Sequence, residues 1–468
     1  MSKRIEIPEA QVARQREIAG DVYKLHQNRS APPKALVSTY GCQQNEADSE
    51  TIRGYLRDMG YIFTDSEKEA DLIVINTCTV RESAASRIWG NVGALVHTKR
   101  DKPDQRIVLC GCMAQEEKTV ARAESSFRHI DLVFGPHALW RLPELLHRLL
   151  TEKGRIFDIS DPEGVIAEDL PQDRVEGPAA WLSIMYGCNN FCSYCIVPHV
   201  RGRERSREPD RILQDVQRLI KDGVKDITLL GQNVNSYGRD LEDGIDFSWL
   251  LEQINAQTGD FLIRFMTSHP KDAGERLFAA MAQCEKVAKH IHLPIQAGNS
   301  RILAAMNRGY TKEQYLALIE AAKRHMPDIV LTSDIIVGFP GETETEFADT
   351  LDVLEQVQFD ALFTFLFSPR SGTPAATMPD PISRAEKQVW FDRMLTLQNE
   401  ISLARHRAYI GTRQRILIDG KSDDARYPLK ARTQGGRLVR LTGPDSLIGQ
   451  FVEVEITDAS TWSLTGQL

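Results

Sequence analysis

Three closely spaced cysteines are the strongest chemical signal in this sequence. Cys188, Cys192 and Cys195 form a C-x3-C-x2-C pattern. Thiolates gathered on one short loop suit an iron–sulfur cluster, because such clusters are held by cysteine sulfur. Three ligands on a four-iron cubane leave one iron without a protein ligand, and an open metal position is typical of a catalytic site. The pattern therefore predicts a catalytic 4Fe–4S cluster with one open iron.

A structural zinc loop is the alternative for the same cysteines. Structural zinc takes four ligands, and His199, four residues past Cys195, could supply the fourth. The spacing favours the cluster and leaves zinc as the minor alternative.

A second set of cysteines, Cys42, Cys78 and Cys112, lies in the N-terminal third of the chain. Each follows a candidate strand, and open α/β sheets bind their ligands at the carboxyl ends of the strands. We therefore expect a second three-cysteine cluster with its own open iron. Cys110 competes for the role of Cys112, because the two side chains share one side of an extended strand. Cys284 follows a helix-like stretch and is expected to pack in a core.

The elements that position these cysteines predict an α/β protein of three domains. Strands and helices alternate from residue 34 to about 150, which predicts a small α/β domain with a parallel sheet. Six βα units between 181 and 407 predict a partial (β/α)6 TIM-like barrel, and short alternating strands over 408–468 predict a small all-β barrel. Residues 1–33 form an N-terminal extension, and residues 151–180, without clear periodicity, are predicted to be a linker. The candidate strands are 36–40, 72–75, 107–109, 182–185, 227–230, 262–265, 290–293, 330–337, 361–365, 415–418, 438–441 and 451–456.

The charge distribution points to RNA. The chain of 468 residues has a net charge of −8, yet residues 405–440 hold ten Lys/Arg against three Asp. A basic β-rich module favours nucleic-acid binding over a merely solvated surface. Arg201 and Arg203, in a charged run after the cysteine loop, could also meet a phosphate backbone. No targeting segment or membrane-length apolar run is visible, so a cytoplasmic enzyme is expected.

Motifs spread along nearly the whole chain resemble the methylthiotransferase family of radical-SAM enzymes. The auxiliary-cluster motifs of that family are similar to residues 39–45, 76–78 and 111–112. Within the family the resemblance is to the MiaB type, the tRNA 2-methylthio-N6-isopentenyladenosine synthases. It is carried by residues 195–207, 230–235, 293–298, 306–310, 367–370 and 372–376, whereas Gln43-Gln44 departs from the commoner Gln-Met.

The resemblance implies an architecture and a set of cofactors. It implies an N-terminal cluster domain, a radical-SAM partial barrel and a C-terminal TRAM module that binds RNA, with S-adenosylmethionine and two 4Fe–4S clusters as cofactors. Cys188, Cys192 and Cys195 would ligate the cluster that binds S-adenosylmethionine and would count as catalytic. The auxiliary cluster would use Cys42, Cys78 and Cys112, so the family pattern selects Cys112 over Cys110. Expected S-adenosylmethionine contacts are Tyr194, Gly231, Gln232, Asn233, Gln296 and Asp334, and expected RNA contacts are Arg201, Arg203, Arg432, Arg437 and Arg440.

The glycine and amide residues in that set have a second interpretation. Glycines such as Gly231 allow close backbone approach to a cofactor, but ordinary turns use the same residue types. The sequence leaves both interpretations of Gly231, Gln232 and Asn233 open.

The implied reaction is the methylthiolation of C2 of N6-isopentenyladenosine at position 37 of tRNA. A 5'-deoxyadenosyl radical would abstract the C2 hydrogen, and sulfur from the auxiliary cluster, methylated by another S-adenosylmethionine, would join that carbon. An aromatic C–H is too inert for acid–base chemistry, so cofactors must carry this step. Expected partners are tRNA, a flavodoxin-like or ferredoxin-like electron donor and an unidentified sulfur donor, with the enzyme a monomer away from membranes.

Three alternatives compete with this function. A RimO-type ribosomal-protein aspartate methylthiotransferase would share both clusters, although the motifs at 232–235 and 296–298 discriminate against it. A methylthiotransferase for threonylcarbamoyladenosine in tRNA is the second alternative. The third, from another class, is a non-catalytic RNA-binding iron–sulfur protein that would not cleave S-adenosylmethionine.

Overall fold

The computed structural model describes residues 5–79, 82–159, 164–242 and 244–468. The chain forms two compact units. The first comprises Met1–Val175, Tyr186–Asn189 and Ile196–Arg207, and the second comprises Glu176–Met185, Asn190–Cys195 and Glu208–Leu468. Each unit is built around hydrophobic cores of its own.

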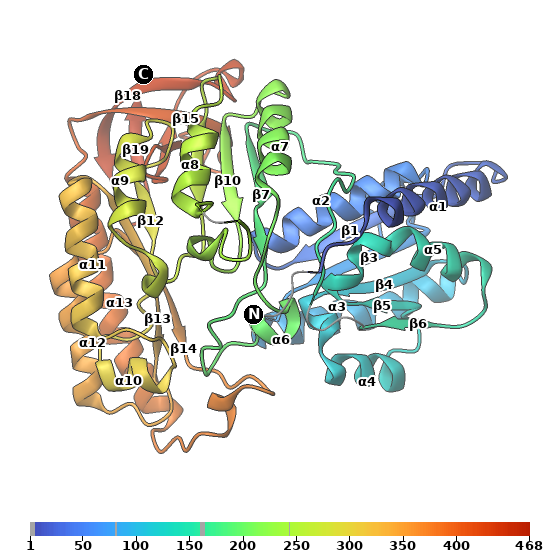
Figure 1. Ribbon diagram of the computed structural model, residues 1–468, viewed down its shortest axis with the longest axis horizontal. Coiled ribbons are helices and arrows are strands. Elements are labelled where there is room, and N and C mark those ends of the chain that lie inside the picture. Colours follow the sequence, from blue (N-terminus) through green and yellow to red (C-terminus); the bar gives the residue numbers. More distant parts are fainter. Residues whose placement is uncertain (1–4, 80–81, 160–163, 243) are drawn as a thin grey trace. The chain divides into compact units, whose positions relative to one another are not determined.

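The first unit contains a six-stranded parallel sheet in the order β2-β1-β3-β4-β5-β6 (Figure 1). Alternate residues of the central strands enter different cores: Leu72 and Val74 pack with the helices on one face, and Ile73 and Ile75 with those on the other. Such continuous apolar strands are expected where helices cover both faces of a parallel sheet. The strands are β1 (Lys34–Tyr40), β2 (Ile62–Phe63), β3 (Leu72–Thr77), β4 (Arg106–Gly111), β5 (Leu132–Phe134) and β6 (Ile156–Asp158).

The helices of this unit divide between those two faces. Residues of α1, α2 and α5 belong to one core, and residues of α3 and α4 to the other. The helices are α1 (Glu9–Gln27), α2 (Gln43–Asp58), α3 (Glu82–Asp101), α4 (Glu117–Ser126), α5 (Leu142–Thr151) and α6 (Val197–Arg201), with 3-10 turns η1 (Cys112–Gln115) and η2 (Pro136–Arg141).

Two segments outside the predicted domains belong to this unit. The N-terminal extension contains α1, which buries Ala19 and Val22 in the core, so this helix is an integral part of the unit. The predicted linker 151–180 contains β6, which forms the sheet edge next to β5. No sequence signal indicated this strand inside the predicted linker, because three residues are too few to show a periodicity.

The second unit contains the predicted six-stranded partial barrel. Two parallel three-stranded sheets, β7-β10-β11 and β12-β13-β14, are connected by a bridge between Ile263 and Val287. The α/β fold class predicted from the sequence is thus confirmed. The strands are β7 (Ala179–Ser183), β10 (Asp226–Leu230), β11 (Leu262–Phe265), β12 (His290–His292), β13 (Val330–Val337) and β14 (Ala361–Leu366); the short strands β8 (Met185–Tyr186) and β9 (Arg205–Ser206) lie outside these sheets.

Helices follow the barrel strands and pack on their outer side (Figure 1). They are α7 (Pro209–Lys221), α8 (Phe247–Asn255), α9 (Glu275–Gln283), α10 (Ser300–Ala305), α11 (Lys312–His325), α12 (Glu344–Val357) and α13 (Arg384–Arg407), with η3 (Val234–Ser236), η4 (Pro270–Asp272) and η5 (Pro374–Thr377). Within the described part of the chain, every helix is too short or too polar to cross a bilayer.

A closed five-stranded barrel ends the second unit, in the strand order β15-β16-β17-β19-β18. Its interior is filled by side chains such as Ile416, Val439 and Ile456, all fully buried. The sequence predicted three of its strands. The strands are β15 (Arg413–Lys421), β16 (Leu429–Thr433), β17 (Leu438–Leu441), β18 (Phe451–Ala459) and β19 (Leu464–Gln467), and η6 (Asp445–Leu447) lies between β17 and β18.

Candidate functional site

The N-terminal cysteines follow three neighbouring strands of the first unit. β3 lies between β1 and β4, and the register aligns Tyr40 with Thr77 and Thr77 with Gly111. Neighbouring strands are about 4.8 Å apart. Cys42 comes two residues after Tyr40, whereas Cys78 and Cys112 come directly after Thr77 and Gly111. The sheet therefore delivers all three thiols to one edge.

Buried amides hold the ends of these strands together. Asn45, fully buried in the first turn of α2, donates to Asn76 Oδ1 at 3.1 Å and to the carbonyl of Thr77 at 3.2 Å. Asn76 donates back to the Asn45 carbonyl at 2.8 Å and to Ser49 Oγ at 2.9 Å. Because Cys42 is the N-cap of the same helix, this network links the segment carrying Cys42 to the segment carrying Cys78.

Gly111 separates the two competing cysteines. Cys110, 1% exposed, lies in β4 among apolar core side chains, whereas Cys112 begins the η1 turn. The turn depends on Gly111, whose φ of 90° and ψ of −166° fall in a region that only glycine occupies readily. The geometry therefore favours Cys112 as the ligand and Cys110 as a core residue.

Replacing Gly111 by alanine should destabilise this strand end. A Cβ there would lie 2.3 Å from Asn76 Oδ1 and 2.4 Å from the Thr77 carbonyl, in addition to the backbone strain. We expect a loss of roughly 1–3 kcal/mol, measured as a lower thermal midpoint, together with lower iron retention. Gly90→Ala is the control, since a Cβ at this position in α3 meets nothing within 4 Å. Equal midpoints for the two variants would contradict the role of Gly111.

Electrostatics distinguish the thiols. The hydrogen bond to Cys78 lowers the pKa of Cys42 to about 6, and the Arg201 cation acts in the same direction. Burial raises the pKa of Cys112, and Arg201 opposes this shift. A position at a helix N-terminus, such as that of Cys42, also favours the thiolate form in which cysteine binds metal.

The donor set fits an iron–sulfur cluster. Three thiols at neighbouring strand ends supply the soft sulfur ligands that iron–sulfur clusters require. Among the described residues, no three His, Cys, Asp or Glu side chains converge on one ion. A cubane does not require such convergence, because it spreads three thiolates over three different irons.

The C-x3-C-x2-C segment contributes to both units. In the first unit the buried Cys188 donates its backbone N–H to the carbonyl of Gly202 at 3.1 Å. In the second unit a turn connects the other two cysteines, with the Cys195 N–H donating to the Cys192 carbonyl at 2.9 Å. Ser193 anchors this turn through Met306, whose carbonyl accepts its N–H at 3.0 Å.

Arg308 is a buried cation beside this turn and was not among the predicted site residues. Its Nη1 lies 3.4 Å from both Cys192 Sγ and the Tyr194 hydroxyl, and its Nη2 donates to the Pro294 carbonyl at 2.8 Å. Tyr310 accepts from Nε at 2.9 Å. The only sequence signal for a role of Arg308 was its position in residues 306–310, one of the segments that resemble the methylthiotransferase family. The guanidinium can stabilise negative charge on the sulfur of Cys192.

Two of the predicted S-adenosylmethionine contacts, Gln296 and Asp334, lie together inside the partial barrel. The Gln296 N–H donates to the Asp334 carbonyl at 2.9 Å, and Gln296 adopts a φ of 76°, unusual for a side chain of its size. The Asp334 carboxylate lies 3.3 Å from His292 Nε2. The other ring nitrogen of His292 lies 3.1 Å from Thr332 Oγ1, so a polar patch lines this part of the barrel.

The other predicted contacts occupy two separate places in the second unit. Tyr194 is half-buried against Arg308, as described above. Gly231, Gln232 and Asn233 follow β10, where a Cβ on Gly231 would lie 2.6 Å from Met185 Cγ. Asn233 donates to Asp272 Oδ2 at 2.7 Å, while its buried Oδ1 accepts no hydrogen bond from the described residues. A side chain at position 231 would therefore collide with Met185, and the buried Asn233 oxygen has no donor among the described residues.

Two of the five predicted RNA contacts are buried in ion pairs. Arg201 is 5% exposed and pairs with Asp48, and Arg437 is 6% exposed and pairs with Asp360. Burial in these ion pairs gives each guanidinium a structural role in this structure, so both RNA contacts remain predictions that the burial does not favour. Arg203 and Arg432 are exposed and Arg440 is half-buried, so these three remain candidates.

The exposed face of β16 suits RNA phosphates. Lys430 and Arg432 alternate with buried residues along this strand and are both exposed. We expect Lys430→Ala/Arg432→Ala to weaken tRNA binding and to reduce the slope of log K against log salt by about 1 for each phosphate that is no longer neutralised, measured by filter binding. The control is Arg426→Ala, an exposed arginine outside β16 that pairs with Asp424 as Arg432 pairs with Asp419. An unchanged slope in the double variant would contradict this assignment.

Three family models match the chain. The Radical SAM superfamily matches residues 182–354, the uncharacterized protein family UPF0004 residues 34–135, and the TRAM domain residues 407–468. A protein of Acetivibrio thermocellus named tRNA-2-methylthio-N(6)-dimethylallyladenosine synthase is 46% identical over 100% of this chain and 98% of its own. This chain belongs to the radical-SAM methylthiotransferase family. A protein of the same name from Alkaliphilus oremlandii is 48% identical over 100% of this methylthiotransferase and 99% of its own length.

A solved structure supports the fold of this methylthiotransferase. The radical S-adenosylmethionine methyltransferase TsrM of Kitasatospora setae, with tryptophan and a S-adenosylmethionine analogue bound, matches with a TM-score of 0.54 and 16% identity over 73% of this chain and 75% of its own. At that identity the likeness concerns the fold alone.

Proposed function

We propose that this protein methylthiolates C2 of N6-isopentenyladenosine at position 37 of tRNA. The observation that carries the proposal is the full-length identity of 46–48% to synthases named for this product. The two cysteine sets support the proposal, because each could supply three thiolates, the ligands that an iron–sulfur cluster requires.

The proposal assigns S-adenosylmethionine and two 4Fe–4S clusters to specific residues. Cys188, Cys192 and Cys195 would hold one cluster, with Arg308 beside Cys192. The strand-end set, Cys42, Cys78 and Cys112, would hold the other. When bound, these cofactors supply the one-electron chemistry and the sulfur that an inert aromatic C–H requires.

The protein's own task is to present one adenine. A base inside a stacked loop is out of reach, so it must leave the stack to enter a pocket, as other base-modifying enzymes require. The basic face of the C-terminal barrel would bind the tRNA backbone without reading its sequence. Gln296, Asp334 and Asn233 supply polar groups inside and after the barrel strands for orienting the cofactor.

The finer partner assignments follow from this chemistry. Reduction of a 4Fe–4S cluster needs a one-electron donor, which we infer to be a flavodoxin-like or ferredoxin-like protein. We further infer that the enzyme acts as a monomer in the cytoplasm, where its tRNA substrate is found.

The test compares substrates. The anaerobically reconstituted enzyme, S-adenosylmethionine and a reductant are incubated with isopentenylated tRNA, threonylcarbamoylated tRNA or ribosomal proteins. Nucleosides and peptides are then analysed by mass spectrometry. We expect a methylthio product on isopentenyladenosine alone. A product only on threonylcarbamoyladenosine or on a ribosomal aspartate, or cluster-loaded enzyme without any product, would overturn the proposal.

A further inference from the structure

One buried arginine connects a cysteine of the second set to a carboxylate. Arg201 ends α6, six residues after Cys195. Its Nε lies 3.0 Å from Cys112 Sγ, and its Nη2 donates to Asp48 Oδ2 at 2.7 Å. Nε and Nη2 form one edge of the planar guanidinium, so a single edge spans both the sulfur and the carboxylate. All three residues belong to the first unit.

The carboxylate is fixed on its other side. Asp48 is buried on α2, the helix that Cys42 caps, and its Oδ1 accepts a hydrogen bond from Gln44 Nε2 at 3.2 Å. Each oxygen of the Asp48 carboxylate therefore accepts a hydrogen bond, Oδ1 from Gln44 and Oδ2 from Arg201. The orientation of the Arg201 side chain is thus determined by the same helix that carries Cys42.

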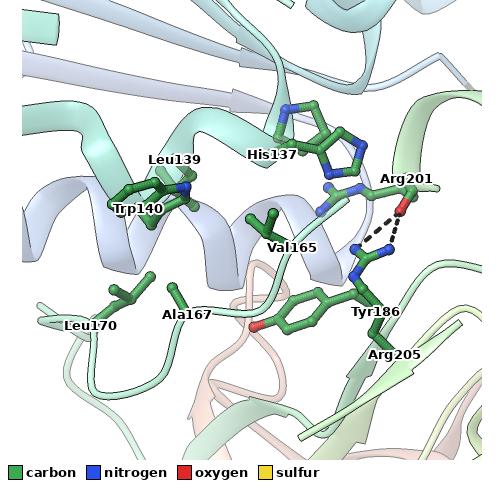
Figure 2. A pocket seen from close by; sticks show the side chains of 10 residues that line it. His137, Leu139, Trp140, Val165, Ala167, Leu170, Tyr186, Arg201 and Arg205 are labelled. Carbon is green, nitrogen blue, oxygen red and sulfur yellow. Dashed lines mark hydrogen bonds between the residues drawn. The ribbon is translucent and has the colours of Figure 1, made fainter. Parts of the chain in front are cut away.

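The backbone of Arg201 is held as well. Nη1 and Nη2 of Arg205 both donate to the Arg201 carbonyl at 3.2 Å (Figure 2). On this side lies a pocket of about 50 Å³, lined by residues that include His137, Trp140 and Tyr186. Burial, with the nearby cations of Arg205 and Arg201, lowers the pKa of His137 to about 3, which leaves its ring uncharged.

We propose that Arg201, oriented by Asp48, is a positioning residue that hydrogen-bonds the Cys112 ligand of the second cluster and raises that cluster's reduction potential. The inference rests on the second cluster of the proposed function. Hydrogen bonds to cluster sulfurs are among the determinants of iron–sulfur potentials, because they stabilise the extra negative charge of the reduced state. A fixed cation next to the sulfur acts in the same direction.

The experiment isolates the second cluster in the full-length chain. The parent carries alanine at Cys188, Cys192 and Cys195, so the iron that it binds belongs to the second set. The midpoint potential is read from the EPR signal of the reduced cluster. The main variant, Asp48→Asn/Arg201→Met, removes both charges of the pair and so avoids leaving a buried carboxylate unpaired. Arg201→Lys keeps the positive charge but loses the planar guanidinium edge that contacts both Cys112 and Asp48.

We expect the charge-neutral variant to shift the midpoint to a more negative potential and Arg201→Lys to shift it less. The matched control is Glu168→Gln/Arg207→Met, which removes another buried ion pair of this unit, with Arg207 Nε 2.8 Å from Glu168 Oε2. It should leave the midpoint in place. An unchanged midpoint in the charge-neutral variant, with about four irons bound, would overturn the inference. If the charge-neutral variant loses its iron, the Arg201→Lys variant provides the test. A midpoint potential of Arg201→Lys equal to that of the parent would then overturn the inference.

Failure of this inference is distinguishable from failure of the proposed function. A parent that binds no iron would contradict the second cluster itself. If the parent binds about four irons and the variants have the same midpoint potential as the parent, only the proposed role of Arg201 is contradicted.

Discussion

Replacing Cys192 by alanine should abolish both the cleavage of S-adenosylmethionine and the formation of methylthiolated tRNA. The loop supplies three cysteines for the first cluster, and Arg308 Nη1 lies 3.4 Å from the sulfur of one of them, Cys192. We expect a fall of more than about 1,000-fold, since uncatalysed reactions are at least about a million-fold slower than enzymatic ones. Release of 5'-deoxyadenosine and mass spectrometry of the nucleosides measure the two reactions.

The control is Cys284→Ala. Cys284 is 4% exposed, follows α9 and packs in the core of the second unit. Its replacement should cost some stability and leave both reactions in place. Full product formation by the Cys192 variant would refute the assignment of the loop as a catalytic cluster site.

Replacing Cys78 by alanine should separate the two reactions. Cys78 is the central member of the strand-end set, bonded through its N–H to the Tyr40 carbonyl at 2.9 Å. Without the second cluster the enzyme should still release 5'-deoxyadenosine. The methylthio product should fall more than about 100-fold, because the sulfur-carrying cofactor is lost.

Cys110→Ala is the matched control for this variant. Cys110 lies on the neighbouring strand β4 but points into the apolar core. A small-to-smaller change there should cost about 1 kcal/mol of stability and leave methylthiolation in place. If Cys110→Ala lost the product while Cys78→Ala kept it, the assignment of ligands to the second cluster would be wrong.

Both cysteine sets are predicted by signals that are local in the sequence. The loop cysteines are close in sequence, and each cysteine of the other set lies within two residues of the end of an apolar strand. Parallel strands put their carboxyl ends on one edge, so the sequence pattern alone predicts the approach of Cys42, Cys78 and Cys112. Cys110 could not be excluded from the pattern, since that required the left-handed turn at Gly111.

Contacts between distant residues were not predictable. Asp48 and Arg201 are 153 positions apart, and nothing near either residue predicts the ion pair. Arg437 and Asp360 likewise meet through tertiary packing. A basic residue in a charged run resembles an RNA contact until its burial is known, which is why two of the five predicted RNA contacts are arginines that this structure buries in ion pairs.

Short elements account for the remaining differences in the fold. β16 and β19 of the C-terminal barrel were not predicted, because a strand of four or five residues with polar residues at alternate positions gives only a weak sequence signal. β6 lies within the segment that was predicted to be a linker. Barrel closure and sheet pairing, rather than local propensity, determine these strands.

The iron and sulfide content of the anaerobically reconstituted full-length chain tests the central claim most directly, namely that one chain holds two clusters. Two cubanes predict about eight irons and about eight sulfides per chain. Replacing either cysteine set by alanines should halve both numbers. About four irons in the unaltered chain, unchanged when Cys42, Cys78 and Cys112 are replaced, would contradict the account.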